Sequence, residues 1–126
     1  MELGNSILED IREAVGLGKG TVDFDTELIM YINIAIGKLN QNGVGNIIAV
    51  TDTTKTWRDL QNPLSIKGNE SFYMIPGFIK LSVKMIFDPP PPSSVDYLTR
   101  SIDEILWRLK IAYEEPSPTL VIIDLD

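Results

Sequence analysis

The sequence predicts a mainly α-helical protein: a four-helix, bundle-like domain with a long irregular loop that contains a short strand, and a C-terminal β-strand tail. Apolar residues recur at helical spacing in separate segments, residues 46–70 lack that spacing, and an aliphatic run follows two prolines near the end. The 126 residues suit one domain. We expect the helical domain to span residues 1–115 and the extended tail to span residues 116–126.

The helical segments are expected at residues 6–15, 25–41, 75–87 and 94–113. Ser6 followed by Glu9 is the pattern of a capping box at the first helix. Gly37, inside the second, costs up to ~1 kcal/mol relative to Ala, which a close helix crossing would explain. The third is apolar almost all round, as is typical of a helix buried between others. The fourth has the clearest apolar periodicity: Val95, Leu98, Ile102, Ile105, Leu109 and Ala112.

Residues 46–70 have a different composition from the helical segments. Ile47–Thr51 is short, apolar and β-branched, which predicts a strand, and Thr56–Asp59 has the cap residues of a single helical turn. So little regular structure over such a length is typical of a functional or interaction loop. We therefore expect residues 46–70 to form an interaction loop, with Trp57 as a candidate contact residue.

Trp107 and Ile111 lie off the main apolar stripe of the fourth helix, one turn apart. They either widen the face that packs on the core or form a second face for a neighbouring subunit. Interfaces favour aromatic anchors, so the second alternative suits a protein that assembles. Both alternatives remain open from the sequence alone.

The aliphatic run Thr119–Leu125 is typical of a β-strand, and a lone strand at the end of a helical chain needs a partner. It either folds back on Ile47–Val50 or pairs with another chain by strand addition. Pro116 and Pro118 stiffen the departure from the helix, which favours the second alternative. The residues expected at that interface are Leu120, Val121, Ile122 and Ile123.

Composition excludes several classes of function. The chain has no Cys and no His, which rules out disulfides, thiol nucleophiles, Cys/His zinc sites and His-based catalysis. No calcium loop, phosphate-binding glycine loop or nucleophile elbow is present, so we expect no enzyme, no cofactor and no metal. The net charge of −7 disfavours a grip on DNA without preventing DNA from passing. With no membrane-spanning run and no signal peptide pattern, cytoplasmic synthesis is expected.

An ordered series of segments carries a resemblance to a known family. The corner Phe87–Pro90, followed by a capped helix that bears Trp107, Arg108 and Leu109, is its most specific part. The series covers roughly residues 5–113 and resembles the head–tail connector (adaptor, or head-completion) family of long-tailed double-stranded DNA bacteriophages. Its segments are Asp23–Leu28, Ile32–Gly45, Thr56–Asp59, Lys80–Pro90 and Ile102–Leu109.

The resemblance implies a structural virion protein, made in the host bacterial cytoplasm, that forms a homo-oligomeric ring below the portal. The ring, a dodecamer to match the portal, would extend the DNA channel and help to retain the packaged DNA. It would let double-stranded DNA pass without sequence-specific binding and would present a docking surface to the next neck or tail protein. No catalytic residue carries over. The alternative is a small cytoplasmic helical adaptor or regulatory binding protein, which would be a monomer or dimer.

Overall fold

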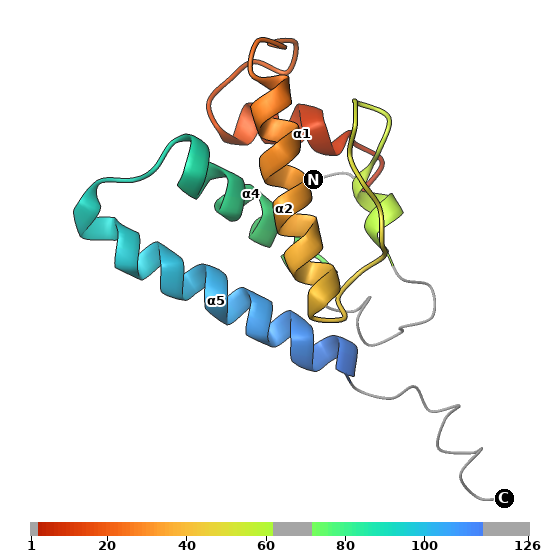
Figure 1. Ribbon diagram of the computed structural model, residues 1–126, viewed down its shortest axis with the longest axis vertical. Helices are drawn as coiled ribbons and strands as arrows, with labels where there is room; N and C mark the ends of the chain where they lie inside the picture. Colours follow the sequence, from red (N-terminus) through yellow and green to blue (C-terminus); the bar gives the residue numbers. More distant parts are fainter. Residues whose placement is uncertain (1–2, 62–71, 115–126) are drawn as a thin grey trace, which may run out of the picture.

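The computed structural model describes residues 3–61 and 72–114 of the chain. These residues form a mainly helical domain, as predicted, and every predicted helix is found within two residues of its expected ends (Figure 1). The elements are α1 (Ile7–Ala14), α2 (Asp25–Gln41), the 3₁₀ turn η1 (Trp57–Leu60), α4 (Met74–Phe87) and α5 (Pro92–Glu114).

Helix α4 is central, because it packs against α1, α2 and α5. The chain reverses at the proline corner after α4, so α5 returns antiparallel to it along one edge of the molecule (Figure 1). Pro92 is the first residue of α5, where a missing backbone N–H costs nothing, so this helix begins two residues before the predicted start.

Every helix and the loop before α4 contribute buried side chains to the core. Burial is uneven along α4: Phe78, Ile79 and Val83 are buried, whereas Ile86 is 51% exposed. The expectation that this helix is buried almost all round is therefore wrong at Ile86, near its C-terminal end. On α5 only Leu109 is fully buried, and the rest of its apolar stripe is half-buried. The largest fully buried side chains are Trp57, Phe72, Phe78, Ile7, Leu8, Ile11, Leu28, Ile32, Ile36, Leu39, Leu60 and Ile75.

The strand predicted at Ile47–Thr51 is wrong: the segment is irregular, and residues 3–61 and 72–114 contain no strand for it to pair with. Its backbone is held instead by a helix side chain: the Asn33 amide donates to the Val50 carbonyl and accepts from the Val50 N–H, both at 2.8 Å. The helical turn predicted at Thr56–Asp59 is confirmed as η1, where the Thr56 N–H donates to the Asp59 carboxylate at 2.8 Å.

Gly37 and the C-terminal tail are the two remaining features on which the sequence raised an expectation. A Cβ at Gly37 would meet nothing within 4 Å, so a close helix crossing does not explain this glycine. The β-strand tail predicted for residues 116–126 lies outside the described residues. Residues 3–61 and 72–114 contain no strand, only an isolated bridge between Ser6 and Thr56, so the structure gives no support to a strand tail.

Candidate protein–protein interface

Trp57, a predicted contact residue, lies in the core of the subunit. Its side chain is fully buried, and its indole N–H donates to the Asp10 carboxylate across 2.7 Å. The Lys80 ammonium lies 5.8 Å from the centroid of the same ring. Trp57 therefore joins the loop to α1 and α4, and it offers no exposed surface to a partner. The sequence shows Asp10 in the first turn of α1 but not its burial, so its contact with Trp57 was not predicted.

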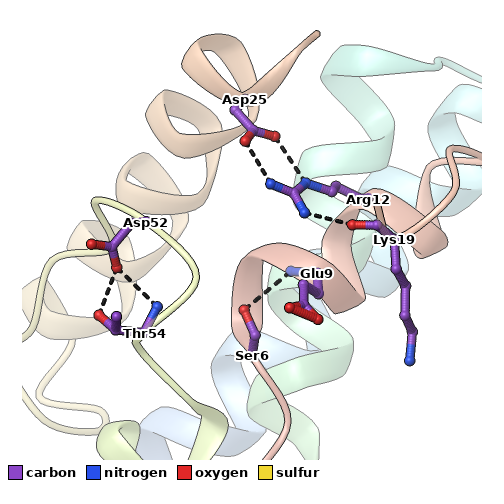
Figure 2. Close-up of polar contacts among 7 residues, drawn as sticks. All are labelled: Ser6, Glu9, Arg12, Lys19, Asp25, Asp52 and Thr54. Atoms are coloured by element: carbon purple, nitrogen blue, oxygen red, sulfur yellow. Dashed lines mark hydrogen bonds and ion pairs between the residues drawn. The ribbon is translucent and has the colours of Figure 1, made fainter. Parts of the chain in front are cut away.

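A second buried polar contact fixes the glycine-rich link between α1 and α2 (Figure 2). Arg12 is buried and makes a bidentate pair with Asp25, with Nε–Oδ1 at 2.9 Å and Nη2–Oδ2 at 2.6 Å. Its third nitrogen donates to the Lys19 carbonyl. The hydrogen bond to Asp25 raises the pKa of Arg12, whose charge is thus held by a partner rather than by water. Asp25 is the first residue of α2, where a carboxylate suits the positive end of the helix dipole, and it also ties the link to α1 through Arg12.

The outward side of α5 carries large apolar side chains that the described part of the chain leaves exposed. Trp107 is 60% exposed, Ile111 39% and Tyr97 70%. Leu109 and the rest of the predicted stripe face the body of the protein, on the other side of the helix. These exposures do not fit the alternative in which Trp107 and Ile111 widen the core face. They leave both side chains available to a neighbour, as the second alternative requires.

A shallow apolar groove of about 210 Å³ lies between α2, α4 and α5, and we call it the α2–α4–α5 groove. Ile34 and Ile86 line it and are 57% and 51% exposed. Sequence periodicity gave no sign of it, because α4 is apolar all round and the pattern does not tell which side is left uncovered. The groove is lined chiefly by Tyr31, Ile34, Lys38, Met85, Ile86 and Ile102.

A second cavity, of about 340 Å³, lies at the proline corner between the end of α4 and the start of α5. Pro89, Pro90 and Pro91 line one part of this cavity, and Lys84 and Asp88 contribute its charged groups.

Within residues 3–61 and 72–114, no three acidic side chains are placed to hold a metal ion. In the same part of the chain, no helix has the length and apolarity needed to cross a membrane.

A small helical domain with an exposed Trp, Tyr and Ile on one helix and an open apolar groove beside it defines a protein that works by contact with other proteins. Comparison with protein families makes this specific. The family model described as phage connector protein matches residues 7–116, and the chain belongs to that family. This confirms the resemblance seen in the sequence. Searches of curated proteins and of solved structures find no match.

Membership of this family indicates a structural connector role, association with other phage head or tail proteins, and a place in the virion. It favours the connector over the alternative of a cytoplasmic adaptor or regulatory protein. The residues that make those contacts are not given by the family match, so Trp107 and Ile111 stay predictions. The interaction role of residues 46–70 also stays a prediction, as do the contacts of Leu120, Val121, Ile122 and Ile123, which lie outside the described residues.

Proposed function

We propose that the protein is a head–tail connector subunit that forms a ring below the portal of a long-tailed double-stranded DNA phage. The ring extends the DNA channel, helps to retain the packaged genome and presents a docking surface to the next neck or tail protein. The observation that carries the proposal is the family match over residues 7–116. A dodecamer would match the portal.

The exposed face of α5 supports assembly. Trp107 and Ile111 project from a helix whose opposite side is already packed on the core. Tryptophan is enriched among residues that dominate the binding energy of interfaces, and on average it is highly buried in folded proteins. We assign Trp107 and Ile111 to the contact between neighbouring subunits of the ring.

The charge of the chain suits passage of DNA. With 18 acidic against 11 basic residues, the subunit carries a net charge of −7. Phosphate contacts from Lys and Arg supply most non-specific DNA affinity, and an acidic lumen provides few of them. The genome would slide through such a ring without being held by sequence-specific or strong electrostatic contacts.

The tail is proposed to dock on a neighbouring neck protein. Strand addition by Leu120–Ile123 needs a strand edge to extend, and residues 3–61 and 72–114 of an adjacent subunit contain none. A strand of the next neck protein would supply that edge. Deletion of residues 116–126 should therefore leave a folded helical subunit that no longer joins the virion neck. Completion of heads by the truncated protein at the full-length rate would contradict this role.

Purified protein, imaged by negative-stain electron microscopy with and without its portal, tests the main proposal. We expect rings on the portal, and we expect mass spectrometry to find the protein in purified virions. A phage that lacks the gene should accumulate filled heads that are not joined to tails, and expression in trans should restore joining. A monomer or dimer that ignores the portal and is absent from virions would instead support the cytoplasmic adaptor.

A further inference from the structure

The α2–α4–α5 groove is an apolar surface that residues 3–61 and 72–114 leave open. Ile34 and Ile86 stand on its two sides, each more than half exposed, and Met85 and Ile102 form half-buried parts of its lining. Its volume of about 210 Å³ is below the range typical of pockets for drug-sized ligands. The groove is thus suited to one large side chain.

The groove also offers polar groups at its edge. The Ser82 hydroxyl, the Asp103 carboxylate and the Tyr31 hydroxyl all belong to its lining. Each oxygen can accept a hydrogen bond. An aromatic ring with a single N–H donor matches such a site, because a buried indole normally needs an acceptor for that N–H. The Lys38 ammonium belongs to the same lining, and a cation can lie against an aromatic ring, so an aromatic side chain uses more of this lining than an aliphatic one.

Trp107 is a fitting occupant, but not from within the same subunit. It follows Ile102 by five residues, so it projects about 140° further round the α5 axis and lies roughly 7.5 Å further along it. The Trp107 side chain is 60% exposed and therefore points away from the groove that Ile102 lines. One helix thus contributes to two different surfaces, an aromatic projection and a groove, that face different directions.

We infer that Trp107 of one subunit fills the α2–α4–α5 groove of the next. This inference rests on the proposed ring and names the surfaces that build it. Because the two surfaces share neither their apolar anchor residues nor their direction, the contact is heterologous. Each subunit gives its Trp107 to one neighbour and receives Trp107 from the other, which is the arrangement that closes rings. Ile111, one turn after Trp107, would pack at the edge of the same contact.

The test compares three single variants, each at an exposed position so that folding is spared. Trp107→Ala removes the projection, Ile86→Glu places a charge in the groove, and Tyr73→Ala is the control, since Tyr73 is 68% exposed just before α4 and belongs to neither surface. Circular dichroism confirms that each variant is folded. Subunit association is measured as ring formation on the portal at graded concentrations. We expect the first two variants to weaken association about thirtyfold, as a hot-spot residue does, and the control to match wild type.

A mixing experiment identifies the contact as one surface against the other. A Trp107→Ala subunit keeps an intact groove, and an Ile86→Glu subunit keeps an intact Trp107. Together they should form one-to-one pairs on the portal, detected by cross-linking, at concentrations where wild type assembles but neither variant alone does.

Normal rings from either variant, or no pairs in the mixture, would overturn the inference while leaving the proposed function in place. A wild-type protein that stops at a symmetric dimer would also overturn it. If wild type neither assembles on the portal nor enters virions, the proposed function fails and the inference falls with it.

Discussion

Replacement of Trp57 by Phe should destabilise the subunit strongly, although the change keeps an aromatic ring. The indole N–H that it removes donates to the Asp10 carboxylate at 2.7 Å, and both side chains are buried, at 0% and 7% exposure. A hydrogen bond to a charged group contributes about 1.5–3 kcal/mol, and the smaller ring leaves a cavity worth ~1 kcal/mol more. We expect the free energy of unfolding to fall by roughly 3 kcal/mol, a large part of the ~5–15 kcal/mol that a domain has.

Urea unfolding followed by far-UV circular dichroism measures this change without relying on tryptophan fluorescence, which the substitution itself alters. The matched control is Trp107→Phe, the same chemical change at the other tryptophan of the chain. Trp107 is 60% exposed, so its replacement should shift the free energy of unfolding by less than ~0.5 kcal/mol. Equal effects at the two positions would refute the assignment of Trp57 to the core and Trp107 to the surface.

A second substitution tests the physical cause. If an unpaired buried carboxylate is what destabilises Trp57→Phe, then Asp10→Asn in that background should restore part of the loss, about 1 kcal/mol, because it removes the charge. In the wild-type background the same change should be mildly unfavourable, since the amide oxygen still accepts from the indole but carries less charge. A double variant no more stable than Trp57→Phe would show that the charge of Asp10 is not the cause.

Other predictions concern the backbone. Gly37→Ala should raise the free energy of unfolding by up to ~1 kcal/mol, since a Cβ there meets nothing within 4 Å. Gly45→Ala should lower the free energy of unfolding by about 1–2 kcal/mol, because Gly45 has φ +77° and its Cβ would lie 3.2 Å from a backbone carbonyl oxygen. Thermal unfolding measures both, and equal shifts of the midpoint at the two glycines would contradict both predictions. Asn33→Ala should speed amide hydrogen exchange at Val50 about tenfold by removing both hydrogen bonds that hold it. Unchanged exchange would show that the segment is held by something else.

The helices were predictable because the signals that define them are local. Apolar spacing places their buried sides, and the residues at their ends set their limits, so α2 begins and ends as predicted and the other helices differ by two residues or fewer. The turn η1 was predictable for the same reason, since Thr56 and Asp59 satisfy each other within four residues. The family also followed from the sequence, because its ordered segments need no knowledge of contacts.

The strand at Ile47–Thr51 failed because β-branched composition describes what a strand tolerates and not whether a partner is present. Here the partner of Val50 is Asn33, a polar side chain on α2 that no strand pattern includes. Trp57 was misplaced for a related reason. Its hydrogen-bond partner lies 47 residues away, and the irregular loop around it gives no periodicity from which burial could be inferred.

By itself, the sequence determined the helical class, the ends of the helices, the acidic charge and the side of α5 on which Trp107 lies. Only the tertiary structure decided which apolar surfaces are covered. Ile86 belongs to a helix that is apolar all round, and its exposure arises because α2 and α5 leave a groove open beside it. The exposure of Trp107 has the same origin, since residues 3–61 and 72–114 leave the outer side of α5 uncovered at this side chain. Apolar periodicity indicates the side of the helix on which a residue lies, whereas the burial of that residue depends on which other elements pack against that side.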